Sequence, residues 1–458
     1  MSDFKNSAFE GYIGTSQVDI TPPLGIYARN WGAADHDVAG GVHRPLLLTC
    51  MAFKTDSGTH PMVLIGADFG VWRSAADGRA IRSAILEEFS LPAGCLMFCL
   101  THNHAGPVLS RDESSKPGGQ YIDAYLIDVR NLAINAVRQA LDSCVPSVMT
   151  WGYGKCNLAT NRDFRNPDSD AFLAGFNPDA EADDTLLVGR ATDMQGNMLA
   201  TLVNYACHPT TLGWQNELLS PDYAGAMRET VTEHTQAPCL FLQGASGNLA
   251  PREQYVADVE IADKHGRQLA YAVLAALESL LPPKTALAFE GVVKSGADLA
   301  IWGRKAVSVS NALQAETVDV VYDLKPLPSL RELEAQYSSC QDRVERERLW
   351  RKLSIRKNLG DGDHVPVPLW VWQIGDAVLV GQPNEAYVDL QLKVRADFYP
   401  HTVAVINLVN GSAGYLPPQT DYDRDLYPVL QTPFAPGSLE RLQDAVTRTV
   451  KQILSNSN

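Results

Sequence analysis

The chain has 458 residues, of which 45% are hydrophobic and 20% are charged, and its formal net charge is −15 at pH 7. This composition supports a large buried core in a globular protein. The acidic excess argues against nucleic acid and anionic membrane surfaces as partners, because phosphate binding needs clustered lysine and arginine. The length suits one large unit or two to three domains.

Neither the N-terminal residues nor any later stretch is apolar and long enough to predict a secretory signal or a membrane-spanning helix. The eight cysteines are scattered without a Cys-x-x-Cys spacing, and most of them stand inside apolar runs. Buried free thiols of this kind are typical of a reducing compartment. We therefore expect a cytoplasmic protein without a membrane anchor.

The first third of the chain alternates between the patterns of strands and helices. Residues 11–20 end at Thr-Pro-Pro and predict an edge strand. Short apolar runs predict further strands, and apolar residues spaced three or four apart predict helices. The predicted strands are 46–54, 62–69 and 96–100, and the predicted helices are 75–88 and 121–141. This order indicates an α/β protein whose mixed, mostly buried sheet is covered by helices.

The same patterns continue towards the C-terminus. Residues 411–436 are rich in Gly, Pro, Asp and Tyr and predict a long ordered loop before a last helix, for which Ser438 is the predicted N-cap. The predicted strands are 184–190 and 198–205, which pair across a turn, 239–243, the hairpin of 369–374 and 377–380, and 402–409. The predicted helices are 224–234, 261–280 and 437–454.

Residues 329–357 differ from the rest because Glu and Arg are interspersed along a helical repeat. That charge pattern predicts a solvated helical hairpin, or a surface for a partner, rather than part of an active site. The sequence has no internal repeat, low-complexity tract or clear linker. One compact unit over residues 1–458, with 329–357 as a charged helical insertion, is the simplest organisation.

The most informative segment is Cys99-Leu-Thr-His-Asn-His-Ala-Gly-Pro107, which includes the end of a predicted strand. Side chains two residues apart on an extended chain point to the same side, so His102 and His104 would both face the strand's end. Two imidazoles there could both bind a divalent metal, or one could bind the metal while the other transfers protons. A His-x-His alone is a weak signal, because two solvated histidines in a surface loop give the same pattern.

Four segments share one layout, in which an apolar strand ends in a polar residue beside Gly or Pro. They are residues 96–107, 202–211, 378–385 and 403–411, the last followed by Gly414-Tyr415. Ligands bind where strand ends meet loops in open sheets. If the four ends cluster, they bring together His102, His104, His208, Glu385 and Tyr415. Nitrogen and oxygen ligands without a thiolate suit zinc, or alternatively manganese or iron.

These motifs, in this order, resemble the neutral, non-lysosomal ceramidases, a family of zinc amidases with a His, His, Glu, Tyr metal site. The resemblance runs through most of the chain. The similar segments are Gly14-Thr-Ser-Gln-Val-Asp-Ile-Thr-Pro22, Gly41-Val-His-Arg-Pro-Leu46, Gly66-Ala-Asp68, Thr101-His-Asn-His-Ala-Gly-Pro107, Asn161-Arg162, Cys207-His-Pro-Thr210 and Phe241-Leu-Gln-Gly-Ala-Ser-Gly-Asn-Leu-Ala-Pro251.

The resemblance implies roles for individual residues. The residues similar to the metal ligands are His102, His208, Glu385 and Tyr415, with Tyr422 or Tyr427 as alternatives to Tyr415. The residues similar to active-site groups are His104 and Arg162. The implied cofactor is Zn²⁺, with another divalent metal as the alternative.

Two departures from the family pattern bear on the substrate. The family's active-site serine falls on Ala250, so a hydroxyl beside the metal is missing unless Ser246 replaces it. The family's C-terminal β-sandwich has no counterpart, so residues 1–458 are expected to form a single catalytic domain. Long-chain ceramide is therefore not the expected substrate, and a lipid also fits poorly with an acidic chain without an amphipathic anchor.

The expected reaction is hydrolysis of an amide or ester bond in a small-to-medium polar substrate. Zinc lowers the pKa of water to about 7, and His104 would take the proton and return it to the leaving group. Arg162 would bind a substrate carboxylate or the oxyanion, joined by N–H groups of the Gly-rich turn. Asp68 would orient a ligand histidine or cap a helix. The residues assigned to substrate and oxyanion are Gly244, Ser246, Asn248 and Tyr427.

Two other functions stay open. The first is a metal-dependent lyase or isomerase in which His104 abstracts a proton next to a carbonyl, which the missing serine favours. The second is a non-catalytic binding or scaffold protein with a degenerate site and residues 329–357 as its partner surface. For an enzyme we expect a small-molecule substrate and no nucleic-acid partner, and a homo-oligomer is left open.

Overall fold

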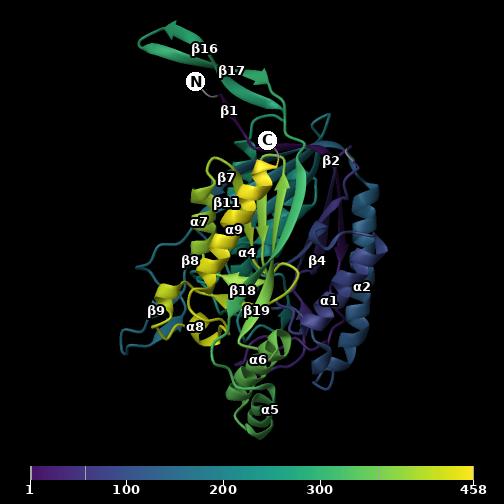
Figure 1. The fold of residues 1–458 in the computed structure, drawn as a ribbon, viewed down its shortest axis with the longest axis vertical. Helices are drawn as coiled ribbons and strands as arrows, with labels where there is room; N and C mark the ends of the chain where they lie inside the picture. The colour runs from purple at the N-terminus through teal and green to yellow at the C-terminus, as the bar shows by residue number, and fades with distance from the viewer. Residues whose placement is uncertain (1–2, 57, 361, 457–458) are drawn as a thin grey trace.

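Two β-sheets form the centre of the structure, a computed structural model that describes residues 3–56, 58–360 and 362–456 (Figure 1). The strands of the larger sheet are β2 Ala8–Asp19, β4 Leu47–Lys54, β5 Met62–Ala67, β6 Leu96–Leu100, β7 Val145–Lys155, β11 Thr185–Asp193, β12 Met198–Tyr205 and β14 Cys239–Gln243. Those of the smaller sheet are β18 Leu313–Asp323, β19 His364–Ile374, β20 Ala377–Gly381 and β22 Thr402–Ile406. The strand orders are β14-β12-β11-β7-β2-β4-β5-β6 and β18-β19-β20-β22.

The facing surfaces of the two sheets form one apolar core. Phe9 and Phe53 from the larger sheet and Trp370 and Trp372 from the smaller sheet pack into it and are all at most 4% exposed. Because side chains alternate along a strand, every second residue enters this core and the others face the helices. The core therefore fixes the two sheets against each other, and with them the strand ends that carry polar residues.

Helices cover both outer faces, which gives four layers. The helices are α1 Ala75–Glu88, α2 Ile122–Asp142, α3 Tyr223–Thr235, α4 Val259–Glu278, α7 Asp389–Asp397 and α9 Ser438–Ser455. α1 and α2 pack on the β4–β5 half of the larger sheet, and α3 and α4 pack on its β11–β12 half. α7 and α9 cover the smaller sheet, towards the viewer in Figure 1. The predicted α/β class, with mixed sheets under helices, is confirmed.

Several smaller elements lie outside these layers. They are β1 Phe4–Lys5, β3 Gly41–Val42, β8 Ala159–Asn161, β9 Asp163–Arg165, β10 Phe172–Ala174, β13 Leu218–Leu219, β15 Leu249–Pro251, β16 Thr285–Lys294, β17 Asp298–Ala306, β21 Asn384–Ala386, β23 Gly414–Leu416, α5 Leu330–Ser339, α6 Arg343–Leu359 and α8 Tyr427–Gln431. β16 and β17 project as a ribbon at the top of Figure 1, with side chains such as Val292 exposed. α5 and α6 form a helical hairpin at the opposite end.

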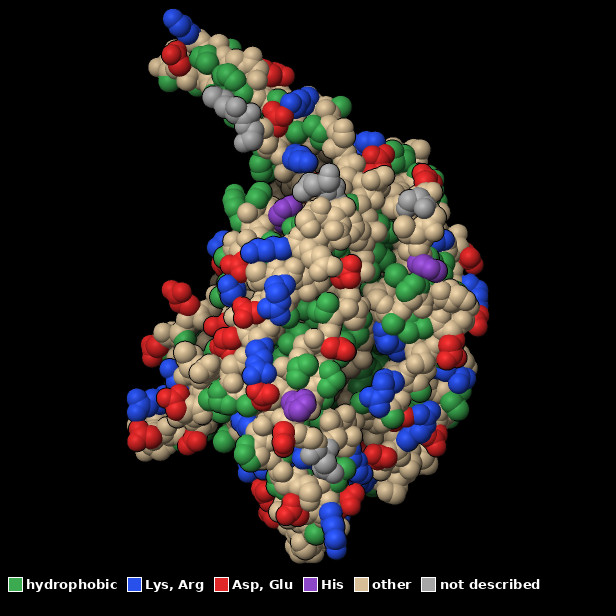
Figure 2. Space-filling view, viewed as in Figure 1, with side chains coloured by type: hydrophobic (Ala, Val, Ile, Leu, Met, Phe, Trp, Pro, Cys, Tyr) green, Lys and Arg blue, Asp and Glu red, His purple; other side chains and the backbone are tan. Residues whose placement is uncertain are grey.

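The surface and the thiols agree with the composition. On the face that Figure 2 shows, acidic and basic side chains are intermixed rather than gathered by sign. No helix in the described part of the chain is long and apolar enough to cross a membrane. All eight cysteines are free and five of them are buried, as predicted.

Most predicted elements exist close to their predicted bounds, and α1, β6 and β14 match residue for residue. The prediction of an edge strand over 11–20 is wrong, because β2 lies inside the larger sheet between β7 and β4. Both edges of β2 are paired, with β7 over residues 8–13 and with β4 over residues 12–19, and α2 covers one of its faces, where the Ser16 hydroxyl donates to Ala136 O at 2.7 Å.

Two predictions near the C-terminus are also wrong. α9 begins at Ser438 and has Gly437 at its N-cap, with φ 89°, while the Ser438 hydroxyl donates to Ala435 O at 2.8 Å. The loop predicted over 411–436 contains β23 and α8. β7 and β18 were not predicted, because Pro, Gly or charged residues interrupt their apolar patterns. Their pairing with β2 and β19 overrides that local signal.

A buried ion pair ties the end of β5 to α3. Asp68 Oδ1 lies 2.7 Å from Arg228 Nη1, and Asp68 Oδ2 accepts from Leu47 N at 2.8 Å. Asp68 is fully buried and Arg228 is 4% exposed. The carboxylate contacts no histidine among the described residues, so it holds the sheet end and does not orient a ligand or cap a helix.

We expect Asp68→Ala to lower the free energy of unfolding by about 3–5 kcal/mol, because the Arg228 charge then stays buried without a partner. Urea unfolding followed by circular dichroism measures this change. The double variant Asp68→Ala/Arg228→Met removes both charges and is expected to recover part of the loss. A double variant at least as unstable as Asp68→Ala would contradict the ion-pair explanation.

Candidate metal centre and cavity

The ends of the strands that carry polar residues meet where the two sheets pack together. Leu100 N, at the end of β6, donates to Leu408 O, just after β22, at 3.2 Å. His102 follows β6, His208 follows β12, and Glu385 lies in β21, shortly after β20. Although His102 and His208 are 106 positions apart in the sequence, their side chains are in contact. The predicted clustering of these strand ends therefore occurs.

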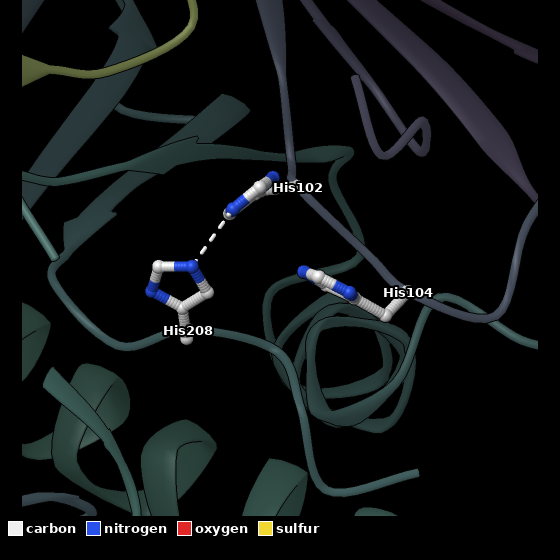
Figure 3. Close-up of side chains that lie close together, drawn as sticks. All are labelled: His102, His104 and His208. Carbon is white, nitrogen blue, oxygen red and sulfur yellow. Dashed lines mark hydrogen bonds between the residues drawn. The ribbon is translucent and has the colours of Figure 1, made fainter. Parts of the chain in front are cut away.

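Three atoms of metal-ligand type face one another at this point. His102 Nε2 lies 2.9 Å from His208 Nε2 (Figure 3). Glu385 Oε2 lies 3.0 Å from His102 Nε2 and 3.2 Å from His208 Nε2. All three residues are at most 9% exposed. Ligand atoms that share a tetrahedral zinc ion lie roughly 3.3 Å apart, so the spacing fits one metal ion.

Hydrogen bonds on the far side of each ring decide which nitrogen carries the proton. His102 Nδ1 lies 3.2 Å from Gly70 O, and His208 Nδ1 lies 2.7 Å from Ser246 O. A carbonyl oxygen only accepts, so each Nδ1 carries a proton, and a ring in its neutral form then presents a lone pair on Nε2. Burial lowers the pKa of His208 to about 3, which keeps its ring neutral. Two lone pairs and a carboxylate oxygen at this range repel one another unless a cation lies between them, so the donor set fits a metal.

The backbone at His102 does not have the extended conformation that the sequence predicted. β6 ends at Leu100, and His102 has φ 68°, in the left-handed region that non-glycine residues rarely adopt. The two histidines therefore do not share an extended segment, so the predicted cause is wrong, although both rings face the same site as expected. Gly70 permits the turn, because a Cβ there would lie 2.6 Å from Asn103 O.

His104 lies beside these groups, with its ring turned towards them (Figure 3). Its ring centroid is 5.0 Å from that of His102 and 5.1 Å from that of Trp31, and one nitrogen from each of the three histidines lies within 4.8 Å of the others. His104 Nε2 is buried without a hydrogen-bond partner among the described residues. Burial also lowers the pKa of His104 well below its usual value. A free nitrogen here can bind an ion or exchange a proton with a molecule in the site.

Glu385 and Tyr415 are opposite each other in the parallel pair of short strands β21 and β23. Gly247 lets β21 approach, because a Cβ on it would lie 2.7 Å from Glu385 O. The Tyr415 hydroxyl accepts from Arg162 Nη2 at 3.3 Å, and burial raises the pKa of this phenol well above its usual value. The hydroxyl has no hydrogen bond to the ligand histidines or Glu385 among the described residues, so its role as fourth ligand stays a prediction.

Arg162 is 4% exposed and lies next to Tyr415. Its Nε and Nη2 donate to Gly247 O at 3.1 and 2.7 Å. Together with the bond to Tyr415, these contacts occupy three of the five N–H donors of a guanidinium. The two donors on Nη1 have no partner among the described residues. Arg162 is thus held rigidly while part of it can bind a ligand.

The Gly-rich turn over 244–248 supports the site from behind and does not line the cavity described below. Gly244 N donates to Tyr205 O and Gly247 N donates to Ala386 O, each at 2.9 Å. These N–H groups have internal partners, so for Gly244 the predicted free oxyanion donor is absent. What the turn supplies is acceptors, since its carbonyls hold the ring of His208 and the guanidinium of Arg162.

The side chains of Ser246 and Asn248 also accept hydrogen bonds from within the protein. The Ser246 hydroxyl accepts from Gln243 Nε2 at 2.6 Å, and Asn248 Oδ1 accepts from Val388 N at 3.0 Å. Ala250, where the family has its serine, lies fully buried in β15. Neither Ser246 nor Ala250 lines the cavity, so replacement of the missing hydroxyl by Ser246 stays a prediction.

A cavity of about 400 Å³ opens onto the site. Among the predicted site residues, those lining it are His102, His104, Arg162, Glu385, Tyr415 and Tyr427. Tyr427 lies at the start of α8, and its hydroxyl accepts from Arg351 Nη1 at 3.1 Å. Aromatic side chains, including Trp31, Trp72 and Tyr255, form much of the remaining wall. His208 is packed behind this wall, with Tyr415 stacked 6.4 Å away.

The charged hairpin predicted over 329–357 exists as α5 and α6, but its predicted separation from the site is wrong. Glu347, Trp350 and Arg351 of α6 line the cavity. Glu347 Oε1 accepts from Arg73 Nη1 and from Arg351 Nε, both at 3.3 Å. These ion pairs turn one side of the helix inwards. The only sequence signal was Trp350, an aromatic residue within the charged run.

No protein-family model matches this chain, and no curated protein matches it by sequence. The four-layer fold is, however, that of a known class of structures. The crystal structure of neutral ceramidase from Pseudomonas aeruginosa superposes with a TM-score of 0.70 at 14% identity, over 97% of this chain and 74% of that chain. A ceramidase complexed with C2 superposes with a TM-score of 0.67 at 15% identity, over 96% of this chain and 74% of that chain. The chain therefore has a ceramidase-like fold, which confirms the resemblance at the level of the fold.

We expect the protein to bind about one divalent ion per chain through its three converging ligand atoms. His102→Ala and His208→Ala are each expected to lose most of the metal, as measured by inductively coupled plasma mass spectrometry after dialysis. Ion at 100 times its Kd should stabilise the wild type by about 2.7 kcal/mol and should stabilise neither variant. Chemical denaturation of each protein with and without Zn²⁺ measures that difference.

His234→Ala is the matched control, because His234 is exposed near the end of α3 and does not line the cavity. It should bind as much metal as the wild type. Stoichiometric metal in His102→Ala, or equal losses in all three variants, would contradict the site.

Proposed function

We propose that this protein is a zinc-dependent hydrolase that cleaves an amide, or ester, bond in a small-to-medium polar substrate. The observation that carries the proposal is the meeting of two imidazole lone pairs and a carboxylate oxygen, within 3.2 Å of one another, beside a cavity. The ceramidase-like fold supports it, because the family that the sequence motifs resemble consists of zinc amidases.

In this proposal His102, His208 and Glu385 hold the ion, and Tyr415 is the fourth ligand. When bound, zinc supplies Lewis-acid chemistry, activating water and polarising a carbonyl group. The chain's own contribution is to fix the direction of each ligand. Gly70 O and Ser246 O do so for the two rings, since each binds Nδ1 and leaves Nε2 for the metal.

His104 is the proposed proton-transfer group. It lines the cavity, its ring lies 5.0 Å from that of His102, and its Nε2 has no partner among the described residues. Because its pKa is lowered by burial, the ring is neutral and can accept a proton from water. It would then deliver that proton to the nitrogen or oxygen of the leaving group.

Arg162 is the proposed oxyanion-binding group. Its contacts with Gly247 and Tyr415 hold the guanidinium in one orientation, and its Nη1 donors remain for the substrate. A preorganised charged donor of this kind stabilises the negative charge that develops on a carbonyl oxygen under attack. Tyr427 supplies a further hydroxyl on the cavity wall.

The cavity of about 400 Å³ supports a small or medium substrate, within the range of typical ligand pockets. The family's serine has no counterpart at Ala250, so the reaction proposed here depends on His104 and Arg162 rather than on a hydroxyl. A small molecule is the proposed partner, and self-association stays a prediction.

We expect His104→Ala to lower kcat for amide hydrolysis by about 10²–10⁴-fold while the metal content stays that of the wild type. Amine release from an amide substrate measures kcat, and mass spectrometry measures metal in the same samples. Reaction in ¹⁸O-labelled water should place the label in the carboxylic acid product, which elimination would not do.

His234→Ala again serves as the control and should keep both activity and metal. Parallel loss of metal and activity in His104→Ala would show that His104 is a ligand instead. Full activity in His104→Ala would remove it from the mechanism.

A further inference from the structure

The charge of the cavity lining, to which α6 contributes, differs from that of the whole chain. The charged side chains other than histidine that line the cavity are Arg73, Arg162, Arg348, Arg351, Glu347 and Glu385. Positive charge is therefore in excess there, although the whole chain has a net charge of −15. A cleft with an excess of positive charge, in a protein that is acidic overall, attracts and orients small anionic ligands.

The two glutamates do not cancel this excess. Glu385 belongs to the proposed metal centre, where the ion would take up its charge. Glu347 shares its single charge between Arg73 and Arg351, each at 3.3 Å. Arg162 binds only neutral partners, a carbonyl and a phenol. Arg348 is paired with Glu345 at 3.6 Å, so the uncompensated positive charge towards the cavity comes from Arg162 and from Arg73 and Arg351, which share one glutamate.

Arg351 is the arginine best placed to bind a ligand beside the metal centre. Its Nε binds Glu347, its Nη1 binds the Tyr427 hydroxyl at 3.1 Å, and its Nη2 binds Asn30 O at 3.2 Å. These contacts use three of five N–H donors, and the other two have no partner among the described residues. The guanidinium is thus positioned before any ligand arrives, which lowers the entropic cost of binding.

A pair of tyrosines connects Arg351 with the metal centre. The ring of Tyr427 packs edge-to-face on Tyr415, with 5.8 Å between centroids. Tyr415 in turn contacts Arg162 and stacks beside His208. Arg162 and Arg351 therefore approach the same tyrosine pair, one on the side of the metal centre and the other on the side of α6.

Aromatic rings form the wall near these charges. Trp350 lies under the guanidinium of Arg73 at 4.7 Å, and Trp31 lies 5.6 Å from Tyr255 and 5.1 Å from His104. Flat apolar surfaces of this kind suit an apolar part of a substrate, while a neighbouring fork of N–H donors suits a planar carboxylate.

From this arrangement we infer that the substrate is an N-acyl amino acid whose free carboxylate binds Arg351 and whose apolar part lies against Trp31 and Trp350. The inference rests on the proposed hydrolase function. Water adds across the amide, the C–N bond breaks, and the products are a carboxylic acid and a free amino acid. The proton lost by water passes through His104 to the amine nitrogen.

The test compares N-acetylated amino acids with apolar side chains with the corresponding neutral carboxamides. Tryptophan fluorescence of the zinc-loaded protein measures Kd, and acetate release measures turnover. We expect the wild type to bind the carboxylates at least about tenfold more tightly than the carboxamides. Arg351→Gln should raise the Kd of the carboxylates by about the same factor and change that of the carboxamides less than about twofold.

Two further variants distinguish a specific loss of the carboxylate site from a general loss of structure. Arg351→Lys keeps the charge but not the planar fork, so it should recover only part of the affinity for carboxylates. Arg346→Gln removes a charge from the same helix at a residue that stacks on Tyr337 outside the cavity lining, and it should bind both ligands as the wild type does. Thermal unfolding of each variant checks that the fold is kept.

The outcomes separate the two proposals. Equal binding of carboxylates and carboxamides by the wild type, or equal effects of Arg351→Gln and Arg346→Gln, would overturn the carboxylate site even if amides are hydrolysed. Preferential binding of carboxylates without acetate release from any substrate would support the carboxylate site and overturn the hydrolase proposal.

Discussion

The site depends on one electrostatic constraint, the meeting of His102 Nε2, His208 Nε2 and Glu385 Oε2 within 3.2 Å of one another. With neutral rings whose Nδ1 protons bind carbonyl groups, all three are acceptors. Burying three acceptors together is unfavourable, and a shared cation turns the same geometry into a strong binding site. The surrounding structure keeps the three groups close together, although they repel one another when no cation lies between them.

The fold imposes that geometry through the packing of its two sheets. The larger sheet carries both histidines on strand ends, and the smaller sheet brings Glu385 and Tyr415 on a second, short parallel pair. The turn over 244–248 lies between them. Its carbonyls bind His208 and Arg162, so one backbone segment orients a metal ligand and the proposed oxyanion group together. A change in the packing of the sheets would therefore displace the candidate metal ligands and Arg162 together.

The α5–α6 hairpin adds a different kind of control. Much of its charge faces solvent, but Glu347 joins α6 to Arg73 of the main body, and Arg351 binds the hydroxyl of Tyr427, whose ring packs on Tyr415 beside the candidate metal centre. In the proposed function, the metal ligands determine which reaction occurs, and the α5–α6 hairpin, inserted between β18 and β19, determines which substrate binds. This division fits a fold shared with ceramidases at 14% identity, where the substrate need not be the same.

The sequence by itself determined the strands and helices with clear apolar periods, such as α1, β6 and β14, and it singled out His102, His104, His208, Glu385 and Tyr415 as a group. Local patterns suffice for these strands and helices, because each is set by neighbours a few residues away. The grouping of the site residues came instead from the shared layout of four strand ends and from the family resemblance. Only the tertiary structure decided that β2 is central, that His102 turns through a left-handed backbone, that Gly244 has no free donor, and that α6 faces the site. Those features depend on partners far apart in the chain, such as Glu385 and His102 at 283 positions, whose contacts no local pattern encodes.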